Sequence, residues 1–131
     1  MESAETPPKV LICGPKKSGK SSLARRVINA LLAHHDSVNL LEADCGQPQF
    51  GCPGFVSITS VCEPLLLPPH CSLRQPDEMM FIGDVSAESN PVTYINTIRK
   101  LLDLHYGATA SGVRVQPLGI LHLKCVNSVC W

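Results

Sequence analysis

The segment Gly14-Pro15-Lys16-Lys17-Ser18-Gly19-Lys20-Ser21 constrains this chain more than any other part of its sequence. It matches the pattern Gly-x-x-x-x-Gly-Lys-Ser/Thr at every fixed position. Glycines let backbone amides turn inward around an anion, and a helix beginning at the lysine adds the positive end of its dipole. The pattern therefore predicts a loop that binds the phosphates of a nucleoside triphosphate.

The surroundings of this loop fit the motif. Residues 10–13 form a short apolar run typical of a buried strand, and apolar residues recur at helical spacing from Lys20 to Leu32. We expect Lys20 to place its ammonium against the outer phosphates and Ser21 to offer a hydroxyl to Mg²⁺. A plain glycine turn before a helix leaves Lys20 unexplained. The expected nucleotide-binding residues are Gly14, Pro15, Lys16, Lys17, Ser18, Gly19, Lys20, Ser21 and Ser22.

One detail of the loop stays open, and two classes of protein that share the loop do not fit the sequence. Lys16 and Lys17 either contact phosphate or are simply solvated. Among proteins that share the loop, a GTPase would need an Asn-Lys-x-Asp guanine reader, which this sequence lacks. The deviant ATPases carry a lysine directly after the first glycine, where this chain has Pro15.

A carboxylate follows the second predicted strand, residues 38–42, which should run parallel to the first. Ligands of open α/β sheets bind outside the carboxyl ends of strands, so Asp44 should lie on the same side as the glycine loop. There it would hold Mg²⁺ or take a proton from an attacking hydroxyl. The alternative is a loop-initiating aspartate before Cys45-Gly46. Glu42 is a weaker candidate, because side chains alternate along a strand and that of Glu42 can point away from the site.

The remaining chain contains further predicted elements. Residues 46–69 are rich in proline and glycine and are interpreted as an excursion over the site, with the strand-like piece 55–59 outside the core sheet. Residues 79–82 form another apolar run. Asn90-Pro91 then predicts an N-cap and first turn for a helix that ends at Gly107. Residues 118–123 are a candidate further strand.

Composition limits the classes of protein to consider. The 131 residues suit one domain, and their net charge of +0 provides no whole-chain attraction for a polyanion. No apolar run is long enough to cross a bilayer and the N-terminus is acidic, so we expect an intracellular protein without a membrane partner. The seven cysteines contain no Cys-x-x-Cys pair and are interpreted as reduced thiols.

Several segments after the loop resemble the polynucleotide 5′-hydroxyl kinase family, in particular its nucleolar branch linked to ribosomal RNA processing. The most specific is the Asp-x-Gly-Gln that begins at Asp44. The likeness covers about residues 10–106. Its segments are Glu42-Ala43-Asp44-Cys45-Gly46-Gln47-Pro48-Gln49-Phe50, Cys52-Pro53-Gly54, Glu63-Pro64-Leu65-Leu66-Leu67-Pro68-Pro69, Phe81-Ile82-Gly83-Asp84 and the helix from Tyr94 to Tyr106.

The resemblance implies a function and a fold. It implies transfer of the ATP γ-phosphate to the 5′-hydroxyl of an RNA or DNA end, within an RNA-processing or ribosome-biogenesis assembly in the nucleolus. Lys20 would stabilise the transferred group, Ser21 and Asp44 would hold Mg²⁺, Asp44 would be the base, and Gly46-Gln47 would shape the acceptor site. The implied fold is α/β: a three-layer P-loop NTPase sandwich with a mainly parallel sheet.

The chain departs from the family pattern mainly in length. We expect a lead-in without fixed structure at residues 1–8, part of a P-loop kinase domain at 9–107, and an atypical tail at 108–131. These limits correspond to the N-terminal half of the kinase domain, so a truncated product or incomplete gene model is expected. Two other functions stay open: a nucleotide-binding module without turnover and a small-molecule P-loop kinase.

Overall fold

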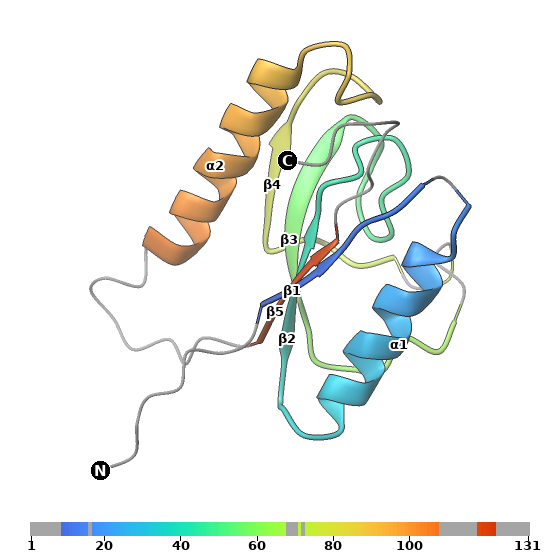
Figure 1. Ribbon diagram of the computed structural model, residues 1–131. Helices are drawn as coiled ribbons and strands as arrows, with labels where there is room; N and C mark the ends of the chain where they lie inside the picture. The colour runs from blue at the N-terminus through green and yellow to red at the C-terminus, as the bar shows by residue number, and fades with distance from the viewer. Residues whose placement is uncertain (1–8, 16, 68–70, 72, 108–117, 123–131) are drawn as a thin grey trace.

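The computed structural model describes residues 9–15, 17–67, 71, 73–107 and 118–122 as an α/β unit (Figure 1). The predicted lead-in, residues 1–8, lies outside this part of the chain, as does most of the predicted tail. Seven elements follow one another along the described residues. They are β1 (Lys9–Ile12), α1 (Lys20–Leu32), β2 (Val38–Glu42), β3 (Phe55–Val61), β4 (Glu78–Phe81), α2 (Pro91–Gly107) and β5 (Leu118–His122).

The strands form one sheet in the order β1-β5-β2-β3-β4. β5 pairs in parallel with both β1 and β2, so β1 and β2 are parallel, as predicted, without being neighbours. The predicted further strand is thus present and fills the position between them. β3 is antiparallel to β2 and to β4. The expectation of a mainly parallel sheet therefore needs correction, because the sheet is mixed.

The expectation that residues 55–59 lie outside the core sheet is wrong. They belong to β3, which lies between β2 and β4. The prolines and glycines that suggested an excursion stand before and after this strand, whereas residues 55–61 contain none. Their β-branched residues alternate between the two faces of the sheet, and Val56 and Ile58 are buried on one of them. The chain reverses its direction between β2 and β3, so these two strands pair antiparallel.

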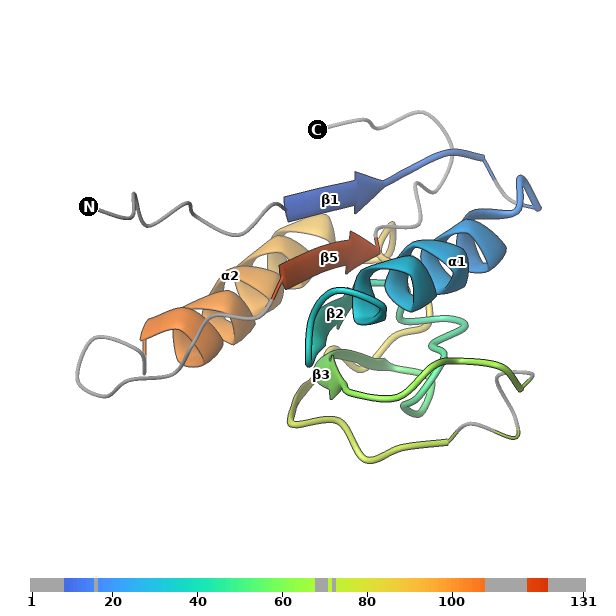
Figure 2. The same ribbon diagram turned by 90° about the horizontal axis from the view of Figure 1, so that it is seen from below.

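The two helices cover opposite faces of the sheet (Figure 2). α1 packs against β1, β5 and β2, and α2 packs against β3 and β4. Successive side chains of β2 point to opposite faces of the sheet. Leu40 therefore belongs to the core cluster under α1, and Leu41 belongs to the cluster under α2. The molecule has three layers, with the sheet in the middle.

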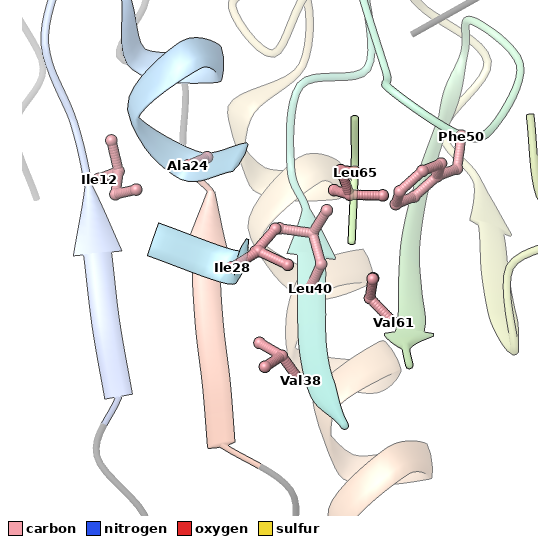
Figure 3. Close-up of a cluster of buried hydrophobic side chains, with 8 residues drawn as sticks. All are labelled: Ile12, Ala24, Ile28, Val38, Leu40, Phe50, Val61 and Leu65. Carbon is pink, nitrogen blue, oxygen red and sulfur yellow. The ribbon is translucent and has the colours of Figure 1, made fainter. Parts of the chain in front are cut away.

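The larger cluster joins α1 to the sheet and to two loops (Figure 3). Ile28 is fully buried on α1, and Phe50 and Leu65 close the cluster from the segments before and after β3. Asn29 on α1 fixes the second segment, because its Oδ1 accepts from the Leu65 amide at 2.7 Å and its Nδ2 donates to the Leu65 carbonyl at 3.4 Å. Both loops that flank β3 are therefore anchored to the core.

The predicted start of α2 is confirmed. Asn90 Oδ1 accepts from the Thr93 amide at 3.1 Å, and Pro91 occupies the first helical position. Within the described residues, neither helix combines the length and the hydropathy needed to span a membrane.

Candidate phosphate-binding site

Positive φ angles occur at three residues of the segment between β1 and α1, as expected for an anion-binding loop. Gly14, Lys17 and Gly19 have φ values of 152°, 61° and 82°. Lys17 is the only residue other than glycine with a positive φ in the described part of the chain. A Cβ at Gly14 would lie 3.2 Å from Ser18 Oγ, so the loop closes tightly at that point. Such turns direct successive amides to one side.

Lys20 is the charged group at the centre of this loop. The residue is only 7% exposed, and its ammonium donates to the Pro15 carbonyl and, at 3.4 Å, to Ser18 Oγ. Within the described part of the chain, no carboxylate forms an ion pair with Lys20. A buried cation is costly unless an anion compensates it. Lys20 therefore fits a site for phosphate.

The start of α1 leaves its positive end open. Gly19 precedes the helix in the left-handed conformation and provides no side-chain cap, and the first turn contains no acidic residue. Ser21 and Ser22 stand exposed in that turn. Unsatisfied amides at a helix N-terminus favour a bound anion. Of the other predicted loop residues, Lys17 and Ser18 are exposed, and Lys16 lies outside the described residues.

Strand register places Asp44 near this loop. Ile12 on β1 and Glu42 on β2 pair with the same residue of β5, His122, so both strands reach the same edge of the sheet. Two strand spacings put their backbones roughly 10 Å apart. The loop beginning at Cys13 and the segment beginning at Ala43 therefore leave the sheet at the same edge, one on each side of β5.

Asp44 organises the backbone that follows it. Its Oδ1 accepts from the amides of Gly46 at 3.1 Å and Gln47 at 3.2 Å. Gly46 is required here because a Cβ would lie 2.7 Å from the carbonyl oxygen of Val85. Gln47 is exposed beside it. The loop-initiating role considered for Asp44 is therefore present, and it holds Gly46 and Gln47 next to the carboxylate.

Glu42 has a structural role that the sequence did not reveal. It is 2% exposed, and its two oxygens accept from successive amides: Oε1 from Gln49 and Oε2 from Phe50, the latter at 3.1 Å. Burial raises the pKa of this carboxyl, the nearby Asp44 charge adds to the rise, and the two amides oppose it. The available signal was an acidic residue at the end of a mostly apolar strand.

Other residues that hold this edge were also missed. The Tyr94 hydroxyl on α2 donates to the Ala43 carbonyl at 2.8 Å, directly before Asp44. Asp84, three residues after β4, accepts from the Ser86 amide at 3.0 Å. Hydrogen bonds from the Ser89 side chain and then from the Ser86 amide lower the Asp84 pKa. The Tyr94 contact joins residues 51 positions apart, which no local pattern reveals, whereas the contacts of Asp84 are local.

Residues 14–120 match the family model described as the mRNA cleavage and polyadenylation factor CLP1 P-loop. Relatives named polynucleotide 5′-hydroxyl-kinase NOL9 are also similar. The zebrafish protein is 44% identical over 94 residues, the human protein 38% over 98 residues and the Arabidopsis thaliana protein 36% over 115 residues.

These alignments cover 72%, 75% and 84% of this chain but 13%, 14% and 31% of the three relatives, in the same order. The chain thus spans less than a third of the length of each. The matched family model includes the glycine loop, Asp44 and β3 through α2, so the fold is that of a P-loop NTPase. The chain belongs to the CLP1 P-loop family, and the polynucleotide 5′-hydroxyl kinases are the relatives that its sequence resembles.

Proposed function

We propose that this chain is the nucleotide-binding part of an ATP-dependent polynucleotide 5′-hydroxyl kinase. The observation that carries the proposal is the buried ammonium of Lys20, which lies in a glycine loop with positive φ angles at the same sheet edge as Asp44. The names of the similar proteins supply the acceptor, a 5′-hydroxyl of a polynucleotide.

The triphosphate is bound by the loop and the start of α1. Backbone amides between Gly14 and Ser22, except at Pro15, which has no N–H, donate to its oxygens. Lys20 leaves the Pro15 carbonyl to contact the group being transferred. The transition state spreads charge over the equatorial oxygens, so a desolvated cation is most effective there. Ser21 and Asp44 would hold Mg²⁺, whose charge offsets that on the phosphates when it is bound.

The acceptor approaches from the Asp44 side. Its 5′-oxygen bonds to the γ-phosphorus, the bond from that phosphorus to the β,γ-bridging oxygen breaks, and ADP leaves. Asp44 accepts the hydroxyl proton, while Gly46 and Gln47 shape the position of the 5′-carbon. Two backbone amides already hold Asp44 Oδ1, which limits the side chain to one orientation.

A label-transfer experiment tests these roles. Incubation with γ-labelled ATP and a 5′-hydroxyl oligoribonucleotide should label the oligonucleotide. We expect Lys20→Ala and Asp44→Asn to lower kcat/KM by about 10²- to 10³-fold each, the range for a group that stabilises charge or moves a proton. Lys100→Ala, an exposed lysine on α2, is the matched control and should leave transfer unchanged.

The pattern of outcomes separates the candidate functions. Labelling that is insensitive to both substitutions would remove the assigned roles. ATP binding that depends on Lys20, without transfer to RNA, DNA or a nucleoside, would instead favour a binding module. Transfer to a nucleoside or metabolite alone would favour a small-molecule kinase.

A nucleolar location and a partner assembly in ribosomal RNA processing complete the proposal. Their support is the resemblance of the segment from Asp44 onward to the nucleolar branch of these kinases. Co-localisation of the tagged chain with a nucleolar marker, and its recovery with pre-ribosomal RNA, are the expected results.

A further inference from the structure

One large aromatic residue stands exposed at the edge of the sheet that carries the candidate site. Phe81 ends β4, an edge strand, and is 68% exposed. Its ring packs against the ring of Phe55 in the adjacent strand, with centroids 5.0 Å apart and planes at 51°. An isolated exposed apolar residue is ordinary. Phe81 differs because other groups hold it in place.

Two glycines enclose the edges of this ring. A Cβ at Gly54 would lie 3.4 Å from Phe81 Cε2, and a Cβ at Gly83 would lie 3.5 Å from Phe81 Cε1. Both glycines have positive φ, 89° and 84°, which other residues rarely adopt. The backbone therefore approaches the ring on both sides, while most of the residue remains in solvent.

Backbone hydrogen bonds connect this ring to the Asp44 segment. The Gly54 amide donates to the Cys45 carbonyl at 2.8 Å, and the Gly54 carbonyl accepts from the Ile82 amide at 2.8 Å. Along the sheet edge, the phosphate loop follows β1, Asp44 follows β2, and Phe81 ends β4. Asp44 thus stands between the loop on one side and the aromatic ring on the other.

We propose that Phe81 is a stacking platform for one of the first bases of a single-stranded polynucleotide whose 5′-hydroxyl lies at Asp44. The inference rests on the proposed function and adds a subsite to it. With triphosphate in the loop, the acceptor must extend away from β1, toward the ends of β3 and β4. Stacking of bases on aromatic rings is tolerant of sequence. It suits a chain whose net charge of +0 provides little general attraction for a polyanion.

Binding and transfer should be measured together, on the wild type and on four variants. The probe is a short 5′-hydroxyl oligoribonucleotide with a 3′-fluorophore, followed by anisotropy. We expect Phe81→Ala and Phe81→Leu to weaken its binding by about 5- to 100-fold, and Phe81→Trp to retain it. Affinity for Mg-ATP should not change. Met79→Ala is the matched control, since Met79 is 44% exposed on the same face of β4, two residues earlier.

An abasic oligonucleotide provides the complementary change. Removing the base at the first or second nucleotide should weaken wild-type binding by the same factor, and Phe81→Ala should then add nothing. Phe81→Leu covers the case in which the alanine variant fails to fold, which thermal unfolding would reveal.

The outcomes distinguish this inference from the proposed function. Normal label transfer by the wild type, with Phe81→Leu binding the oligonucleotide as tightly as wild type, overturns the platform alone. Equal losses in Phe81→Trp and Phe81→Ala also overturn it, because an aromatic ring would then not suffice. A wild type that neither binds nor labels the oligonucleotide overturns both proposals.

Discussion

Glu42 and Asp44 stand two positions apart, yet their carboxylates have different surroundings. Asp44 is partly exposed and fixes the amides of Gly46 and Gln47. Glu42 is buried and fixes the amides of Gln49 and Phe50. Together they determine the path of the chain from β2 to Phe50. Ionising a buried carboxyl is costly, so Glu42 fixes this loop at a cost in stability wherever the group is charged.

The Glu42→Gln variant tests the cost of this buried carboxylate. Because burial raises the Glu42 pKa, the fold favours the acid form. The stability from this group is fully present below its ordinary value of 4.5 and is lost as the pH rises through the raised pKa. Wild-type unfolding free energy should therefore fall relative to that of Glu42→Gln over this range.

Denaturant unfolding at a series of pH values measures the difference between the two proteins. The unfolding free energy of Glu42→Gln should also be lower by a constant amount of about 1–3 kcal/mol. The reason is that the amide nitrogen of glutamine cannot accept a hydrogen bond from one of the two backbone amides. Exposed Glu88→Gln is the control and should follow wild type. Parallel wild-type and Glu42→Gln profiles would contradict the raised pKa.

Gly46→Ala tests the close approach of two loops. The added Cβ would lie 2.7 Å from the Val85 carbonyl, and backbone cannot yield as a flexible side chain does. We expect a loss of about 1–3 kcal/mol in unfolding free energy and a large fall in label transfer. Gly51→Ala is a matched control, because its Cβ would meet nothing nearer than 3.9 Å. Equal behaviour of the two variants would show that the approach of the loops is unimportant.

At the scale of elements, α2 serves the site through one residue. Its apolar face packs on β3 and β4, and Tyr94 reaches beyond this contact to the Ala43 carbonyl. The hydrogen bond holds the end of β2 where Asp44 leaves the sheet. α2 therefore has two separable roles, one in the core and one at the site.

Tyr94→Phe and Asn90→Ala separate these roles. The first removes the hydroxyl that bonds to Ala43, and the second removes the N-cap of α2. Each should cost about 1 kcal/mol of stability. Only Tyr94→Phe should lower the rate of phosphate transfer, with ATP affinity unchanged in both. Denaturant unfolding and steady-state kinetics provide the comparison, and similar transfer rates in the two variants would contradict a positioning role for Tyr94.

Sequence patterns predicted the elements better than their pairing. The apolar runs before Gly14 and at 38–42, and the Asn90-Pro91 start of α2, are local signals and lie where they were expected. β3 was missed as a core strand because its neighbours contain the prolines and glycines. The place of β5 between β1 and β2 depends on pairing across more than 70 residues, which no local pattern encodes.

At the scale of the whole molecule, the site residues too could be predicted only where a local sequence pattern marks them. Spacing predicted Lys20 and Asp44 because a motif and a strand end determine their positions. Glu42, Tyr94 and Phe81 were not assigned roles, since their contacts come from other strands and from α2. The carboxyl edge of the sheet brings all five residues to one side of the molecule. Under the proposed function, the strand order places the phosphate donor and the acceptor on opposite sides of Asp44.

Binding of Mg-ATP by the folded chain tests the central claim most directly. A ligand that binds only the native state stabilises it, by about 2.7 kcal/mol at a hundredfold excess over Kd. Calorimetric titration should therefore saturate, thermal unfolding should shift upward with nucleotide, and Lys20→Ala should abolish both effects while Lys100→Ala preserves them. A wild-type chain that remains folded yet takes up no Mg-ATP at millimolar concentration would contradict the account.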